Sequence, residues 1–166
     1  MRLPHKGEKA VSKLGAMAAL IAAALMLGLG QAAAGQELSD GQTLYVPCYS
    51  HIYHGVNSRP FDLAVTLSIH NVDMTEPLTL EVVDYYDTNG DRLRSYLDEP
   101  VTVPPLATVE YLVEQMDESG GSGANFIVVW SSERGMNPPL VESVMIGTSS
   151  QQGISFTSRG VVLETR

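Results

Sequence analysis

The stretch that decides the fold is Asn125-Phe126-Ile127-Val128-Val129-Trp130. Phe126, Val128 and Trp130 share one parity and Ile127 and Val129 share the other, so a strand formed here is apolar on both faces. Strands of this kind are usually covered on both sides. We therefore predict a central strand over residues 125–130, enclosed on both faces, with the other strands arranged about it.

Short segments of strand character recur along the rest of the chain, at intervals of roughly ten residues. The clearest runs from Phe61 to Asn71, where every second residue is apolar. A change of parity at Val82-Val83 predicts a bulge, and Asn89-Gly90 predicts a hairpin turn. The other expected strands cover residues 43–53, 78–86, 92–97, 101–103, 107–113, 140–148 and 154–163, the last interrupted at 158–160.

About eight short strands and no convincing helix in this part of the chain predict an all-β fold. We expect an antiparallel β-sandwich of the Ig-like or Greek-key type, with a small β-barrel as the alternative. Pro47 cannot donate to a ladder, so the strand over residues 43–53 should lie at an edge or contain a bulge. We expect loops over residues 117–123 and 133–139.

Residues 1–34 have the features of a secretory signal. Four basic residues precede the uncharged run from Leu14 to Gly30, and the segment ends in Ala32-Ala33-Ala34. We expect cleavage after Ala34, a flexible lead-in over residues 35–42 and one domain over residues 43–166. An uncleaved anchor is the alternative, because the run approaches the roughly 20 residues of a spanning helix. Both interpretations predict a periplasmic or secreted domain, with membrane contact only through the N-terminal segment.

Without this segment the chain has six arginines and no lysine against eighteen acidic residues, a formal charge of −12. Such a charge repels nucleic acid and anionic lipid, so neither is an expected partner. The acidic composition is more consistent with calcium binding, with a cationic partner or with simple solubility. Cys48 is the only cysteine, which excludes an intrachain disulfide. We expect it to be a small buried apolar side chain, the alternative being an exposed thiol that pairs between chains.

Two motifs suggest a metal site, and both have a simpler explanation. Cys48, His51 and His54 have the spacing of transition-metal ligands. In a continuous strand, however, His51 faces away from the other two, so we expect local hydrogen bonding instead. The second motif has calcium-loop spacing, but Arg92 stands where such a loop requires glycine, and a hairpin turn explains it without calcium. Its candidate ligands are Asp87, Asn89 and Asp91.

Catalysis has little support in the sequence. No Gly-x-Ser-x-Gly elbow is present. Glu110 and Glu114 share a strand face at a separation of about 13 Å, which is too far for the carboxylate pair of a glycoside hydrolase. We expect a solvated acidic face there and no enzymatic activity.

Recognition has better support, from two stretches. The strand over residues 43–53 carries an aromatic stripe of one parity, made of Tyr45, Tyr49, His51 and Tyr53. This stripe suits contact with a protein or a sugar, because each side chain combines an apolar body with a polar end. A polar segment over residues 149–160 contains Arg159, which can anchor a carboxylate of the domain itself or of a ligand. We expect the internal salt bridge. The candidate binding face comprises Tyr45, Tyr49, His51, Tyr53, Gln151, Gln152 and Arg159.

Four segments resemble a bacterial family of secreted proteins, domain-of-unknown-function family 3124. The four segments are Tyr45-Val-Pro-Cys-Tyr-Ser-His-Ile-Tyr-His-Gly55, Asp84-Tyr-Tyr-Asp87, Ser119-Gly-Gly-Ser-Gly-Ala-Asn-Phe-Ile127 and Ser150-Gln-Gln-Gly-Ile-Ser-Phe-Thr-Ser-Arg-Gly160. The resemblance implies a secreted or periplasmic domain and brings no activity, cofactor or catalytic residue. Cys48 departs from the aliphatic residue associated with that position. More distantly, the strand order is similar to the small β-sandwich of the sensory-rhodopsin transducer family.

The sequence as a whole predicts an exported binding or assembly module with a protein or small-molecule partner in the cell envelope. One alternative is a metal-dependent enzyme or metal-binding protein that uses His51 and His54. Another is a structural envelope protein without a ligand.

Overall fold

A computed structural model describes residues 37–149 and 152–166 of the chain. The predicted signal or anchor over residues 1–34 lies outside these residues, and so does Gln151. The described residues form one compact unit. Among the described residues, no helix has the length and apolar character needed to cross a membrane.

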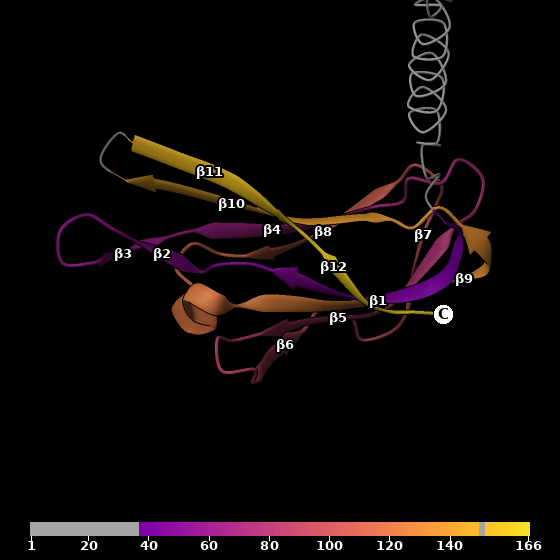
Figure 1. The fold of residues 1–166 in the computed structure, drawn as a ribbon, viewed down its shortest axis with the longest axis horizontal. Helices are drawn as coiled ribbons and strands as arrows, with labels where there is room; N and C mark the ends of the chain where they lie inside the picture. Colours follow the sequence, from indigo (N-terminus) through magenta and orange to yellow (C-terminus); the bar gives the residue numbers. More distant parts are fainter. Residues whose placement is uncertain (1–36, 150–151) are drawn as a thin grey trace, which may run out of the picture. The chain divides into compact units, whose positions relative to one another are not determined.

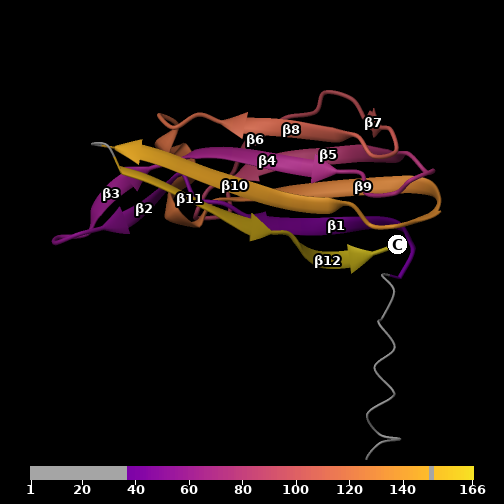
Figure 2. The same cartoon turned by 90° about the horizontal axis from the view of Figure 1, so that it is seen from above.

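Two antiparallel sheets pack against each other, and a small two-stranded ladder projects beside them (Figure 1 and Figure 2). The six-stranded sheet has the order β12 (Val161–Thr165), β1 (Ser39–Pro47), β9 (Asn125–Met136), β5 (Leu78–Tyr86) and β6 (Arg92–Ser95). Its sixth strand, β7 (Val101–Val103), also pairs with β5. The four-stranded sheet has the order β11 (Gln152–Arg159), β10 (Leu140–Ser149), β4 (Ala64–His70), β8 (Thr108–Val113). The projecting ladder joins β2 (His51–His54) to β3 (Arg59–Asp62).

The predicted antiparallel β-sandwich is confirmed. Within residues 37–149 and 152–166 the sheets do not close on themselves, so the alternative of a small barrel is wrong. The described chain also has more strands than we expected, twelve in place of about eight. The expected loop over residues 117–123 is largely a short 3-10 helix, η1 (Glu118–Gly123).

β9 is the central strand, as predicted, because it pairs with both β1 and β5. Phe126, Val128 and Trp130 are fully buried between the two sheets. Ile127 and Val129, on the other face, remain partly exposed, so the expectation that both faces are enclosed is wrong. The second sheet covers only one side of the six-stranded sheet. β9 also continues to Met136, through much of the loop that we expected over residues 133–139.

The first predicted strand is divided in the structure. β1 begins at Ser39, inside the expected lead-in, and ends at Pro47. It lies between β12 and β9, so it is not an edge strand, but it contains the bulge predicted as the alternative, between Thr43 and Leu44. Pro47 is tolerated because it is the last residue of the strand and pairs with β9 alone, after the β12 ladder has ended at Tyr45. The chain leaves the sheet here and resumes as β2.

Other sequence predictions hold closely. The apolar positions of β4 and the preceding Leu63 are buried. The bulge in β5 lies between Leu80 and Val82, one residue before its predicted place. The turn between β5 and β6 has Gly90 at φ +88°, a conformation that glycine adopts without strain. The last predicted strand is two strands in different sheets, and the chain crosses from β11 to β12 at Gly160 (Figure 1).

Two buried polar residues that the sequence analysis did not single out join the loops at one end of the sandwich. One Asp73 carboxylate oxygen accepts the backbone N–H of Thr75 at 2.9 Å and of Glu76 at 3.0 Å. Its other oxygen accepts the backbone N–H of Asn137 at 2.9 Å. The Asn71 side-chain amide donates to the carbonyl of Val103 at 3.1 Å. These bonds tie together the β4–β5, β7–β8 and β9–β10 connections.

The Asp73 network makes stability depend on pH. The backbone N–H groups of Asn137, Glu76 and Thr75 hold the pKa of the Asp73 carboxyl well below its ordinary value of 3.8. The ionised carboxylate therefore stabilises the fold above about pH 4, and this contribution is lost as the pH falls further. We expect Asp73→Asn to unfold at a lower denaturant concentration at neutral pH, with the difference from wild type shrinking below about pH 4.

Denaturant titrations monitored by circular dichroism at a series of pH values would measure this difference. Asp98→Asn, at an exposed position, is the control and should change the midpoint little. A constant gap between wild type and Asp73→Asn down to about pH 2 would contradict the assignment, because Asn resembles the protonated carboxyl.

Candidate functional site

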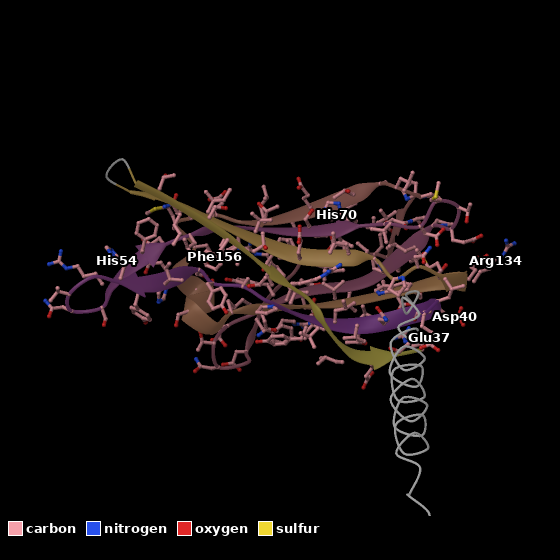
Figure 3. The ribbon with its side chains drawn as sticks, turned by 45° about the horizontal axis from the view of Figure 1, so that its top comes forward. Glu37, Asp40, His54, His70, Arg134 and Phe156 are labelled. Carbon is pink, nitrogen blue, oxygen red and sulfur yellow. The ribbon has the colours of Figure 1, made fainter. Side chains whose placement is uncertain are left out.

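The β2–β3 hairpin projects from one end of the sandwich, near the start of β11 (Figure 1). A concave site lies between them. We call it the hairpin cleft. Its volume is about 450 Å³, within the usual range of small-molecule sites. Figure 3 shows His54 on the projecting hairpin and Phe156 on β11 at this end of the domain. The residues that line the cleft are Ile52, His54, Phe61, Gly153 and Ile154.

Alternation along the hairpin places the wall of the cleft. Ile52 lies opposite Phe61 in the β2–β3 ladder, and His54 follows on the same face as Ile52. The His54 and Phe61 rings meet edge to face, with centroids 5.5 Å apart. Such a contact stabilises the hairpin tip and orients the imidazole along the cleft wall.

The position of the Phe61 ring in the cleft wall depends on a glycine. Gly147 of β10 lies opposite Ile154 in the β10–β11 ladder. A Cβ atom on Gly147 would collide with the ring of Phe61, the side chain of Leu63 and the carbonyl of Asp62. The bare backbone at Gly147 therefore allows the Phe61 ring to rest directly on the β10 strand.

A smaller polar pocket of about 170 Å³ adjoins the cleft, and His54 and Phe61 line both. Its polar lining includes Asp62, Gln115 and Thr148. The Gln115 amide donates to the Asp62 carbonyl at 3.1 Å, which fixes the base of the hairpin to the end of β8. An apolar slot therefore lies beside a polar one, with a histidine and a phenylalanine between them.

The predicted aromatic stripe does not form one face, because the strand that carried it is broken after Pro47. Tyr45 lies on the side of β1 that faces away from the core. Tyr49 packs on Phe156 of β11, with ring centroids 5.9 Å apart. His51 and Tyr53 contact each other, with Nε2 and the hydroxyl 3.2 Å apart, on the hairpin face that points away from the cleft.

The polar half of the predicted face is only partly described. Gln151 and the side chain of Gln152 lie outside the described residues. Arg159 is exposed and lies opposite Glu142 in the β10–β11 ladder, but within residues 37–149 and 152–166 it forms no salt bridge. The internal salt bridge that we expected is therefore absent from the described part. Arg159 lines a separate pocket of about 310 Å³ together with Gln42 and Val162.

The histidines do not converge on a metal position. His51 and His54 lie on opposite faces of the hairpin, and Cys48 is fully buried in the core. Throughout the described residues, no group of three or more histidine, cysteine or acidic side chains is arranged to hold a metal ion. A site built on His51 and His54 together has no geometric support.

The calcium candidates are engaged within their own turn. One Asp87 carboxylate oxygen accepts the backbone N–H of Asn89 at 2.8 Å and of Asp91 at 2.9 Å. These bonds lower the pKa of the Asp87 carboxyl, and the bond from the Asp91 backbone N–H has the larger effect. The carboxylate thus closes the β5–β6 turn, in the way expected of an aspartate that begins a turn.

The sequence analysis missed the cleft residues Phe61 and Ile154. Phe61 begins the alternating run that continues through Leu63, so parity assigns it to the core. β3 ends at Asp62 and pairs with β2, so Phe61 lies in the projecting hairpin, partly buried against the edge of the core. No spacing in the sequence indicates that Ile154, about ninety residues later, faces it.

A family profile described as "Protein of unknown function (DUF3124)" matches residues 41–163. The chain belongs to the DUF3124 family. The resemblance drawn from the four sequence segments is thereby confirmed at the level of the family. The DUF3124 match covers all the lining residues of the hairpin cleft and assigns no activity to them.

No curated protein matches the chain. Among solved structures, one described as "Crystal Structure of Thermotoga maritima 1070" aligns with a TM-score of 0.46 and 10% sequence identity. The alignment covers 75% of this chain and 97% of that one.

Cys48 provides a test of the core beside the hairpin. Its side chain is fully buried, and burial raises the pKa of the thiol to about 12. Very little thiolate therefore forms at pH 8, and the surrounding core shields it from reagents. We expect no reaction with Ellman's reagent in the native protein and stoichiometric reaction in denaturant. Rapid native labelling would show that Cys48 is the exposed thiol of the alternative interpretation.

Proposed function

We propose that this DUF3124 domain is a binding module that works outside the cytoplasm and holds the apolar part of an amphipathic ligand in the hairpin cleft. The observation that carries the proposal is the cleft itself. Two hairpins distant in sequence meet there around a concave, mainly apolar space of ligand size.

The chemistry of the lining supports a ligand of mixed character. Ile52, Phe61 and Ile154 offer apolar contact, and His54 supplies a donor or an acceptor at the rim. The adjoining pocket adds further polar groups, at Gln115 and Thr148. A ligand that matches this arrangement has an aromatic or aliphatic group next to a hydroxyl or amine, as in a small molecule or a projecting side chain of a partner protein.

Export is supported by the sequence of residues 1–34, with its basic start, uncharged run and Ala-x-Ala end. The charge of −12 on the remaining chain suits a soluble domain and disfavours nucleic acid as the ligand. The alternative of a metal-dependent enzyme is weaker, because His51 and His54 lie on opposite faces of one hairpin.

Phenol and tyramine are suitable probes, since each combines one ring with polar groups. We expect both to shift the ¹H–¹⁵N NMR signals of Ile52, His54, Gly153 and Ile154, with dissociation constants in the range of about 1–10 mM. Phe61→Ala and Ile154→Ser should each weaken binding about fivefold or more, because each removes apolar contact area.

Met116→Ser, at a position that is 84% exposed and outside the cleft lining, is the control. Ile154 is 40% exposed, so its substitution tests the cleft even if Phe61→Ala disturbs the fold. Shifts spread evenly over the surface, or affinities unchanged in both cleft variants, would refute the proposed site. Absence of any shift would favour the structural envelope protein instead.

A further inference from the structure

The six-stranded sheet carries an apolar patch on the side that faces away from the sandwich core. We call this the outer face and define it by Tyr45, Val82, Ile127, Val129 and Val161. Tyr45 lies directly opposite both Ile127 and Val161 in its two ladders. Val129 lies directly opposite Val82. Since residues opposite each other share a face, these side chains form a continuous patch across four strands.

These residues do not serve the core. None of them belongs to the core cluster or to the partly buried side chains packed against it. Val161 is 58% exposed, and the other four are half-buried by their neighbours in the sheet. The solvent face of an antiparallel sheet is ordinarily polar, so an apolar patch at its centre indicates an interaction surface.

We propose that the outer face binds the outer face of a second copy of this chain. Two identical sheet faces can stack about a two-fold axis, so that each copy covers the same patch of the other. The two layers would then bury the second face of β9, which the sandwich itself leaves open.

The charges around the patch favour a second copy. The chain after residue 34 carries a formal charge of −12, and most of its surface would repel another copy. At the outer face, however, Asp84 is paired with Arg92 at 3.1 Å and Glu81 with Arg166 at 3.1 Å. Glu164, opposite Thr43, adds one further carboxylate at the edge. The patch is therefore close to neutral, and two copies can approach there without strong repulsion.

The size of the face sets the expected affinity. Four strands about 4.8 Å apart and five residues of about 3.4 Å each give a face of roughly 19 Å by 17 Å, or about 320 Å² per copy in projection. Both copies together would cover about 650 Å², which is below a standard interface of about 1,200–2,000 Å². We therefore expect a weak, reversible dimer with a dissociation constant in the micromolar range.

Sedimentation velocity, from about 2 to about 200 µM protein, tests the proposal. The protein is expressed as the full chain and purified in the form that the cell produces, whether the N-terminal segment has been cleaved or retained. We expect concentration-dependent dimerisation in wild type and at least about fivefold weaker dimerisation in Ile127→Thr and Val129→Thr, which keep β-branched side chains and strand propensity. Leu112→Thr is the matched control, because Leu112 is 60% exposed on β8 of the other sheet.

A second measurement separates this dimer from other associations. In Val129→Cys, a bismaleimide should link two copies, whereas Leu112→Cys should remain largely monomeric. Cys48 is fully buried and should contribute no background. A monomer at the highest concentration would overturn the proposal, as would dimerisation unchanged in both outer-face variants. An unreactive introduced thiol in monomeric Val129→Cys would also overturn it, because another segment of the same chain would then cover the face.

Discussion

Burial of the inward side chains of β9 is the interaction on which the rest of the structure depends. Phe126, Val128 and Trp130 project from the centre of the six-stranded sheet, and the four-stranded sheet closes over them. Each such side chain contributes roughly 1.5–3 kcal/mol when it is fully removed from water. The Trp130 indole N–H has no hydrogen-bond acceptor among the described residues, at a cost of about 1–3 kcal/mol. The area that the large ring buries offsets this cost.

Polar groups complete the fold where the apolar layer ends. At one end, Asp73 and Asn71 supply the partners that the loop amides and carbonyls lack. At the other, the Ser50 hydroxyl and the Tyr85 hydroxyl are 2.8 Å apart in the buried region beneath η1. The Ser50 amide donates to Gly121 of η1 at 3.0 Å, and the Cys48 amide donates to Ala124 at 2.9 Å. These bonds hold the chain after it leaves β1 and direct the β2–β3 hairpin away from the sandwich, which creates the hairpin cleft.

The two surfaces that we propose to bind partners arise from one property of the sandwich. With two layers, each sheet has a single covered face, and apolar residues beyond those needed for the core remain accessible. At the hairpin end they line a concave cleft of ligand size. On the outer face they form a patch that extends across four strands, which suits another sheet better than a small molecule. The shape of each surface thus indicates a different kind of partner.

The sequence by itself determined the central strand, the alternation of β4, the bulge in β5, the turn at Asn89-Gly90 and the family, because these depend on local parity, turn chemistry and ordered motifs. It did not determine which face of β9 is covered, since Ile127 and Val129 are as apolar as their neighbours. It also did not indicate that Phe61 meets Ile154, or that Asp73 reaches Asn137. Only the tertiary structure decided these points, because they depend on which distant segments the two sheets bring together, and parity within one strand carries no information about that.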